Sequence, residues 1–307
     1  MDRSWRRAAL IAGGVGTAAV AGCGSPSAAA DAPSAAVVET PAALAGERNL
    51  VAEAYDGRYR AVASVLESPA RGPQLCWSMA ESLPPQCGGP DVRGWDWSAV
   101  PAESVAGTTW GHYELVGTFA DGAFTLTEPA LARDPGAGPG STRPEEDRFA
   151  TPCAPPAGGW MPPDPARATE GALRAAQEVA AGSPGYAGLW IDQRVPAAEL
   201  TGENGNDPQR IVLNASTTAD VRELEAALRQ VWGGSLCVSS APRSEADLLA
   251  VQEALRDVPE ALYTVPDPFA GTVDLAVVRG TLEQQRALDE QFGAGAVRLS
   301  SQLEPID

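Results

Sequence analysis

Five cysteines are the most reactive side chains in this chain, and their spacing sets one of them apart. Cys23 stands alone near the start, whereas the other four form an even set: Cys76, Cys87, Cys153 and Cys237. Four thiols in an oxidising compartment allow three pairings, and we favour Cys76–Cys87 with Cys153–Cys237. These bonds would close loops of about 12 and about 85 residues and stabilise the fold by about 3 and about 4.5 kcal/mol through loop entropy. Paired in this way, they leave no thiol for nucleophilic catalysis.

Tryptophan side chains offer a second kind of chemistry, an aromatic platform for a glycan or a peptide. Together with Trp77, the candidates are Trp95, Trp97, Trp110 and Trp160. Because an indole ring is costly to expose, packing in the core is the favoured interpretation of these residues. One or two exposed rings would favour binding instead.

His112 is the single histidine, which excludes zinc sites built on two or three imidazoles. It alternates with Glu114 in a predicted strand and is interpreted as a surface residue. A copper site with Met79 and the reduced Cys76 and Cys87 is the alternative, but thiol oxidation outside the cell competes with it. A Ser-His-Asp triad would also need His112, and the chain has no G-x-S-x-G motif to supply the serine.

Carboxylates are abundant, with 40 Asp and Glu residues. The segment Glu203–Asp207 offers oxygen ligands for calcium, but it lacks the spacing of a calcium loop and is interpreted as a turn. Asp192, Glu223 and Glu225 are candidates for a glycosidase acid and base, which requires two carboxyls about 5 to 9 Å apart in a cleft. A solvated acidic surface is the favoured interpretation. We therefore expect no catalytic residue, no metal site and no cofactor.

The composition excludes further classes of function. The formal net charge is −18, and every one of the 22 basic residues is arginine. Without lysine there is no phosphate-binding loop, no Schiff base and no Ser-Lys dyad. A surface this acidic repels phosphate backbones, which argues against a nucleic-acid partner.

The residues before Cys23 have the features of an export signal. Three arginines precede a short apolar run, residues 8–20, and Val20-Ala21-Gly22 places small side chains directly before Cys23. The run is too short to cross a bilayer. This order resembles a bacterial lipoprotein signal with a lipobox, which implies that residues 1–22 are removed and that Cys23 is lipidated. We therefore expect a lipid-anchored protein on the extracytoplasmic face of the cell membrane.

The first part of the remaining chain predicts β structure. Residues 23–47 are rich in Ala, Ser and Pro and are expected to form a disordered tether. Residues 48–130 carry strand signals, with apolar alternation from Tyr113 to Phe119 and a hairpin turn at Asp121-Gly122. We predict a small antiparallel β domain, a barrel or a sandwich, which resembles an oligonucleotide/oligosaccharide-binding barrel.

The second part predicts a linker and an α+β domain. Residues 131–167 are rich in Pro and Gly and read as a linker. Cys153 would pin this linker to the second domain, so only its first part is expected to be mobile. Residues 168–307 alternate strands and helices. They predict an α+β domain with helices on one face of a sheet.

A repeat of about 60 residues is visible within this second domain. The helix at 221–232 leads to Val238-Ser239-Ser240, just as the helix at 282–292 leads to Leu299-Ser300-Ser301, and a strand pair precedes each helix. The pattern predicts two strand-strand-helix-strand units. Capping boxes that begin at Ser244 and Thr281 predict the starts of two helices.

Several motifs resemble a family of uncharacterised actinobacterial lipoproteins. They cover most of the chain after Cys23: Gln74-Leu-Cys76, Leu83-Pro-Pro-Gln-Cys-Gly-Gly-Pro90, Gly94-Trp-Asp-Trp97, Thr125-Leu-Thr-Glu-Pro129, Pro152-Cys-Ala-Pro-Pro-Ala-Gly-Gly-Trp160 and Trp232-Gly-Gly-Ser-Leu-Cys237. That family has no known activity to carry over. The units of the second domain are also similar to repeats in the pro-segments of secreted bacterial serine proteases, which implies fold alone.

These observations favour a non-catalytic binding or assembly module at the outer face of the cytoplasmic membrane. A cell-wall glycan or another envelope protein would be its partner. One alternative is a carboxylate-dependent hydrolase of envelope polysaccharide, which would need a deep cleft with paired acids of raised pKa. Another is a protein-interaction or protease-inhibitor-like module, suggested by the similarity to pro-segments.

Overall fold

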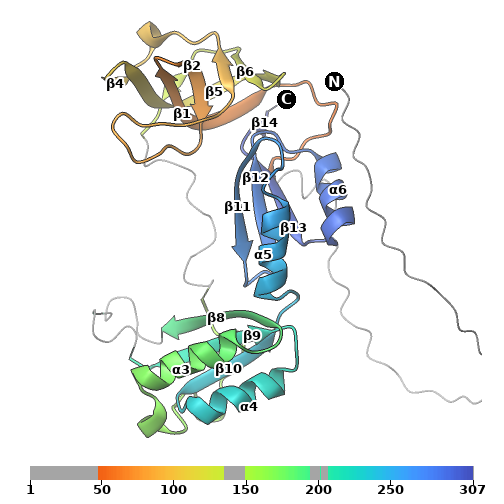
Figure 1. Cartoon of the computed structure of the whole chain (residues 1–307). Helices are drawn as coiled ribbons and strands as arrows, with labels where there is room; N and C mark the ends of the chain where they lie inside the picture. Colours follow the sequence, from red (N-terminus) through yellow and green to blue (C-terminus); the bar gives the residue numbers. More distant parts are fainter. Residues whose placement is uncertain (1–47, 135–148, 194–200, 202–206, 307) are drawn as a thin grey trace, which may run out of the picture. The chain divides into compact units, whose positions relative to one another are not determined.

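The computed structural model describes residues 48–134, 149–193, 201 and 207–306 (Figure 1). The predicted signal, the tether and Cys23 therefore lie outside the described residues, as does most of the segment 203–207 that is interpreted as a turn. The described part is α+β, as the sequence predicts, with its strands in three sheets. Figure 1 labels β1, β2, β4, β5 and β6 in one sheet and shows the labelled helices with the other two.

The first sheet closes on itself. Its strands pair in the order β14-β1-β2-β3-β6-β5-β4, and β5 also pairs with β1, so that β1, β2, β3, β6 and β5 form a ring. All neighbours in this ring are antiparallel except β3 and β6. The domain is thus a barrel and not a sandwich. Its elements are β1 Tyr59–Ser68, β2 Arg71–Cys76, β3 Asp91–Arg93, η1 Trp97–Ala99, β4 Glu103–Val105, β5 Thr108–Ala120, β6 Ala123–Leu126 and β7 Leu131–Ala132.

Alternation along the strands fills the barrel. In β1 every second residue from Tyr59 to Val65 is buried, and in β5 the buried partners include Tyr113 and Leu115. These side chains meet Leu75 and the other residues of one core cluster, because successive residues of a strand point to opposite faces. The β5–β6 turn has positive φ at Asp121 (52°) and Gly122 (69°), the backbone that a tight hairpin requires.

The end of the chain belongs to this barrel sheet, which corrects the expected extent 168–307 of the second domain. Strand β14, Glu304–Pro305, pairs with Tyr59 and Arg60 of β1. Leu303 is fully buried in the barrel's core cluster, as is Val278. Apolar burial at the C-terminus therefore joins segments that composition alone assigns to different domains.

A first repeat unit follows the barrel. Its elements are α3 Glu170–Ala181, β8 Tyr186–Gln193, β9 Ile211–Thr217, α4 Val221–Val231 and β10 Ser235–Ser240. The sheet order is β10-β9-β8, parallel between β10 and β9 and antiparallel between β9 and β8. Figure 1 shows α3 and α4 beside this sheet. Leu213 of β9 and Leu228 of α4 are fully buried in the shared core.

A second repeat unit has the same topology. Its elements are α5 Glu245–Ala254, β11 Ala261–Asp267, β12 Thr272–Val277, α6 Leu282–Phe292 and β13 Val297–Ser301. The sheet order is β11-β12-β13, antiparallel and then parallel. Leu275 of β12 and Leu299 of β13 pack with Leu248 of α5 in its core.

The duplication predicted from the sequence is present, but each unit has its own three-stranded sheet and a helix before its strand pair. This corrects the expected single sheet with helices on one face. The predicted capping boxes are also present, at Ser244 with Asp247 and at Thr281 with Gln284. Reciprocal bonds between cap and third residue satisfy amides that the first helical turn leaves unpaired.

The predicted linker 131–167 is structured where it is described. Strand β7 pairs with β5 of the barrel, and η2 (Pro165–Arg167) precedes α3. Between them, residues 149–153, which we call the strap, contact the first repeat unit through Thr151 and Cys153. The part expected to be mobile falls on 135–148, outside the described residues.

Candidate functional site

Three aromatic rings gather at one place in the barrel. Trp95 and Trp97 flank the start of η1, and Tyr113 lies on β5. The Trp95 ring centroid is 5.1 Å from that of Trp97 and 4.9 Å from that of Tyr113, both edge-on. Edge-to-face contacts at this spacing stabilise a ring cluster beyond its area burial. The cluster joins the η1 region to β5.

Hydrogen bonds fix two of these rings and leave the third with a spare donor. The Trp97 indole Nε1 donates to Glu67 Oε2 (2.5 Å), and the Tyr113 hydroxyl donates to the Pro101 carbonyl (2.6 Å). The Trp95 Nε1 is buried and has no hydrogen-bond partner within the described residues. An unsatisfied buried donor costs about 1–3 kcal/mol, so its retention needs an explanation.

Trp95 lines a groove between two segments of the barrel. The groove has a volume of about 320 Å³ and runs between the η1 region and the chain that follows β6. Its lining residues are Gly94, Trp95, Asp96, Ala99, Val100, Leu126, Thr127, Glu128, Pro129 and Ala130. A half-buried indole with apolar neighbours and a few polar groups is the usual composition of a small-ligand site.

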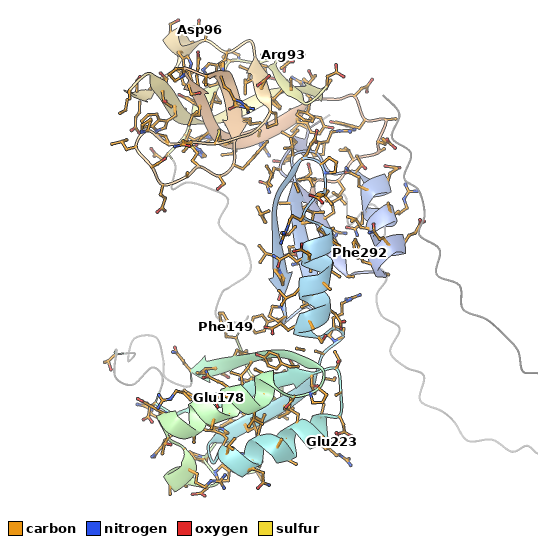
Figure 2. The ribbon with its side chains drawn as sticks, viewed as in Figure 1. Arg93, Asp96, Phe149, Glu178, Glu223 and Phe292 are labelled. Atoms are coloured by element: carbon orange, nitrogen blue, oxygen red, sulfur yellow. A yellow bond between two sulfur atoms is a disulfide. The ribbon has the colours of Figure 1, made fainter. Side chains whose placement is uncertain are left out.

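The rim of the groove is acidic. Asp96 caps η1 and accepts from the Ser98 hydroxyl (2.7 Å) and amide (2.9 Å), and these bonds hold its pKa below the ordinary range. Glu128 is half-exposed and forms an ion pair with Arg58 (2.6 Å). Figure 2 labels Asp96 at the outer surface of the barrel. The rim therefore offers ionised oxygen acceptors to a ligand.

A second hollow of the barrel is larger, at about 440 Å³, but it holds no aromatic ring. It is lined by Arg71, Gly72, Gln74, Gly89, Pro90, Asp91 and Gly122. Without an apolar surface against which a ligand can pack, this hollow is the weaker candidate.

The predicted aromatic platform is only partly assembled. Trp95 and Trp97 share the ring cluster, whereas no ring contact joins Trp110 or Trp160 to it among the described residues. Trp110 lies on β5 opposite Leu66 and Glu103, and Trp160 lies in the segment that precedes η2. Trp77 packs against the barrel core. All five tryptophans are half-buried, so none of them is fully exposed or fully enclosed in the core.

His112 lies across the strand pair from Ser64, and its Nδ1 is 3.4 Å from the Ser64 hydroxyl. Burial lowers the pKa of His112. No carboxylate of the described residues bonds to the ring, so a serine nucleophile here would lack the third group that orients the base. Cys76, the other neighbour of Ser64, is bonded to Cys87, and the thiols that the copper alternative requires are consumed.

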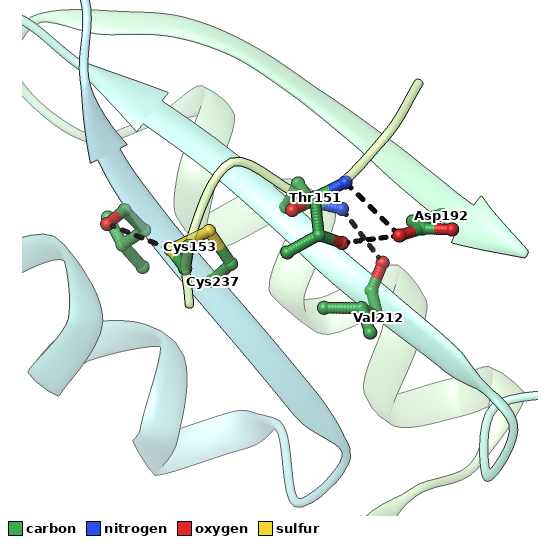
Figure 3. Close-up of a disulfide and its surroundings, with 7 residues drawn as sticks. Thr151, Cys153, Asp192, Val212 and Cys237 are labelled. Atoms are coloured by element: carbon green, nitrogen blue, oxygen red, sulfur yellow. Dashed lines mark hydrogen bonds between the residues drawn. A yellow bond between two sulfur atoms is a disulfide. The ribbon is translucent and has the colours of Figure 1, made fainter. Parts of the chain in front are cut away.

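The disulfides are Cys76–Cys87 and Cys153–Cys237, the pairing that the sequence analysis favours. Figure 3 shows Thr151 between the second bond and Asp192, a candidate carboxylate. Asp192 accepts from both the amide (3.1 Å) and the hydroxyl (2.7 Å) of Thr151. Its place in the strap contact gives this carboxylate a structural role.

The other candidate carboxylates are not brought together. Glu223 and Glu225 lie exposed on α4, and Figure 2 shows Glu223 on the outside of that helix. Glu260 has a pKa raised by burial, opposed by Arg279, but it lies in the turn before β11 and does not line either groove described above. No group of three or more metal-binding side chains occurs in the part of the chain that the structure describes.

Sequence reasoning missed the second wall of the groove. Residues 126–130 follow the predicted hairpin, and all but the last of them belong to the motif Thr125–Pro129, which carries no site assignment. Glu67 and Glu128 had no sequence signal, because their partners Trp97 and Arg58 lie 30 and 70 residues away. These two contacts form only when the barrel closes and brings distant segments of the chain together.

Comparison with known proteins gives no relative: no family model matches the sequence, and no curated protein matches it. Across the described residues, no helix combines the length and the apolar character needed to span a bilayer.

Proposed function

We propose that this chain is a non-catalytic, lipid-anchored binding module on the extracytoplasmic face of the cell membrane, and that the groove beside Trp95 is its ligand site. Cys23 would carry the acyl chains, and residues 23–47 would tether the folded part. The observation that supports the binding role best is a groove of about 320 Å³ in which Trp95 and apolar side chains lie together with the carboxylates of Asp96 and Glu128.

The alternative of a polysaccharide hydrolase has less support. A general acid needs a carboxyl whose pKa is raised toward neutrality. In the groove, the pKa of Asp96 is lowered and not raised, because its carboxylate accepts two hydrogen bonds from Ser98. The other carboxylate, Glu128, forms an ion pair with Arg58. These two carboxylates are suited to accept hydrogen bonds from a ligand.

Binding would be tested by calorimetric titration of the full chain, purified in detergent, with soluble fragments of cell-wall glycan. We expect Trp95→Ala to weaken binding at least tenfold, because aromatic anchors dominate small interfaces. Trp160→Ala is the matched control, since it removes the same ring at a site outside the groove. Equal affinity of wild type and Trp95→Ala, or hydrolysis of the glycan, would contradict the proposal.

The anchor would be tested separately, by growing cells with a labelled fatty acid. Label is expected on the wild-type chain and not on Cys23→Ala, which should also leave the membrane fraction. Label on both chains would contradict lipidation at Cys23.

A protein-interaction module remains the second candidate, and one observation favours it. Tyr263 and Val265 are 49 % and 46 % exposed at neighbouring positions on the same side of the edge strand β11. Large apolar side chains exposed together are typical of contact surfaces. Retention of surface proteases by the immobilised chain, reduced by Tyr263→Ser, is the expected result for this candidate, and no retained partner would count against it.

A further inference from the structure

The residues that line the groove include no basic side chain, which limits what it can bind. Asp96 and Glu128 are its charged groups, and Arg58 beside them is already ion-paired with Glu128. The chain as a whole carries a net charge of −18. An anionic ligand would therefore meet repulsion both at a distance and at the rim.

The side chains that line the groove offer mainly hydrogen-bond acceptors. The carboxylates of Asp96 and Glu128 accept when ionised, and the Thr127 hydroxyl, which donates to the Val116 carbonyl (3.3 Å), keeps acceptor capacity. A ligand that satisfies this set must donate hydrogen bonds, as sugar hydroxyls and amino groups do.

An indole surface adds a second requirement. Leu126, Val100 and Ala130 provide apolar contact next to the Trp95 ring. A pyranose ring presents C–H groups on one side and hydroxyls at its edge. Such a ring packs against an aromatic surface while its hydroxyls reach the rim.

Building on the binding function proposed above, we infer that the groove takes an uncharged or amino-bearing saccharide and rejects acidic ones. An amino group on the ligand would be attracted by the carboxylates of Asp96 and Glu128, whereas a carboxylate or phosphate on the ligand would be repelled by them.

Three tetrasaccharides of the same length test this inference by calorimetric titration of the full chain: N-acetylglucosamine, glucosamine and galacturonate tetramers. We expect the neutral and amino tetramers to bind and the galacturonate tetramer to bind at least tenfold more weakly than the neutral one. Raising the salt concentration should weaken the amino tetramer and leave the neutral one unchanged.

Two variants assign the effect to named atoms. Asp96→Asn keeps a cap for η1 but removes its charge, so it should reduce affinity for the amino tetramer by about threefold and spare the neutral one. Trp95→Phe keeps an aromatic ring but reduces its contact area, so it should weaken both by about three- to tenfold. Trp110→Phe is the control, because Trp110 does not line the groove.

The outcomes separate the ligand class from the site. Tighter binding of galacturonate, lost in Trp95→Ala, would overturn the ligand class and keep the groove as the site. Saccharide binding that is unchanged in Trp95→Ala would overturn the groove itself. Absence of binding by all three tetramers would overturn both.

Discussion

The two repeat units have the same strand register but different surfaces opposite their helices. Each begins its strand pair with a bulge, between Tyr186 and Gly188 in the first unit and between Ala261 and Tyr263 in the second. Aligned on these bulges, the two sheets match position by position. The row across the middle of the face reads Trp190, Asn214, Cys237 in the first unit and Val265, Asp274, Arg298 in the second.

In the first unit this face is covered. The strap crosses it, fixed by the Cys153–Cys237 bond and by Thr151 on Asp192. Phe269, from the β11–β12 turn, packs on Trp190 with centroids 5.0 Å apart. As a result every residue of β9 is buried, including Asn214, whose Oδ1 has no partner within the described residues.

In the second unit an ion pair joins two of the three residues in the equivalent row. Arg298 forms a two-bond ion pair with Asp274 (2.7 and 2.9 Å), and both side chains are about one-third exposed, at 39 % and 33 %. Val265 and Tyr263 remain exposed beside them. The same backbone pattern therefore carries two kinds of surface. In the first unit a disulfide-bonded strap buries the sheet face, and in the second unit the face stays partly exposed to solvent and carries an ion pair.

The largest expected effect comes from removing the cover of the first unit. The double variant Cys153→Ser/Cys237→Ser should lose about 4.5 kcal/mol of stability, since the bond closes the longer loop. Urea unfolding followed by circular dichroism measures the loss. The matched variant Cys76→Ser/Cys87→Ser should lose about 3 kcal/mol, and an equal or greater loss there would contradict the loop-length argument.

A smaller effect is expected from exchanging equivalent buried helix residues. Leu224 of α4 is apolar, whereas Gln285 of α6 donates to the Val297 carbonyl and accepts from the Leu299 amide, both at 3.0 Å. Gln285→Leu should cost about 1–3 kcal/mol because it leaves those two groups unpaired. Equilibrium unfolding in urea gives the value.

The reciprocal change sharpens the same comparison. Leu224→Gln should also cost about 1–3 kcal/mol, by burying an amide in a core built for apolar contact. Leu224→Met, which conserves volume, is its control and should cost less than about 1.5 kcal/mol. If Gln285→Leu left the free energy of unfolding unchanged, the hydrogen bonds from Gln285 to β13 would not stabilise the fold.

The ion pair of the second unit should contribute less. Both partners are partly exposed, so Asp274→Asn is expected to cost about 0.5 kcal/mol or less after solvent screening. The difference from wild type should vanish in about 1 M salt, where the Debye length is about 3 Å. A cost that persists in high salt would show that packing, and not charge, holds this row.

The smallest effect is a local response to acid that distinguishes the first helices of the two units. In α5 the Asp247 carboxylate accepts from the Ser244 hydroxyl (2.6 Å) and amide (3.1 Å), and these bonds lower its pKa. Because the pKa of Asp247 is lower in the folded state than the unfolded-state value of about 3.8, its carboxylate stabilises the fold at any pH above that unfolded-state pKa. This stabilisation is lost as the pH falls through the folded-state pKa. The α3 cap, Thr169, does not titrate.

Amide hydrogen exchange measures this difference. Lowering the pH from about 6 to about 3 should open the first turn of α5 more than that of α3, after correction for intrinsic exchange. In Asp247→Asn the extra opening should disappear. Equal opening of both helices in the wild type would mean that the capping box contributes nothing.

Local sequence patterns anticipated most of the secondary structure. The hairpin at Asp121, the caps at Ser244 and Thr281 and the repeated helix-to-strand passage are features of a few adjacent residues. The pairing of Cys153 with Cys237 was one of three pairings that the cysteine count allowed, and it is the one that the sequence analysis favours. By contrast, the groove could not be predicted, because its two walls meet only when β3 pairs with β6.

The amino-acid sequence by itself determined the α+β class, the duplication and the even set of four cysteines that forms the two disulfides, because propensity, capping and cysteine spacing act over short stretches or by count. Tertiary structure decided that β1 closes on β5, that the last residues join the barrel and that the strap covers one repeat and not the other. Those outcomes depend on burying apolar surface between segments far apart in the chain, which no local pattern specifies.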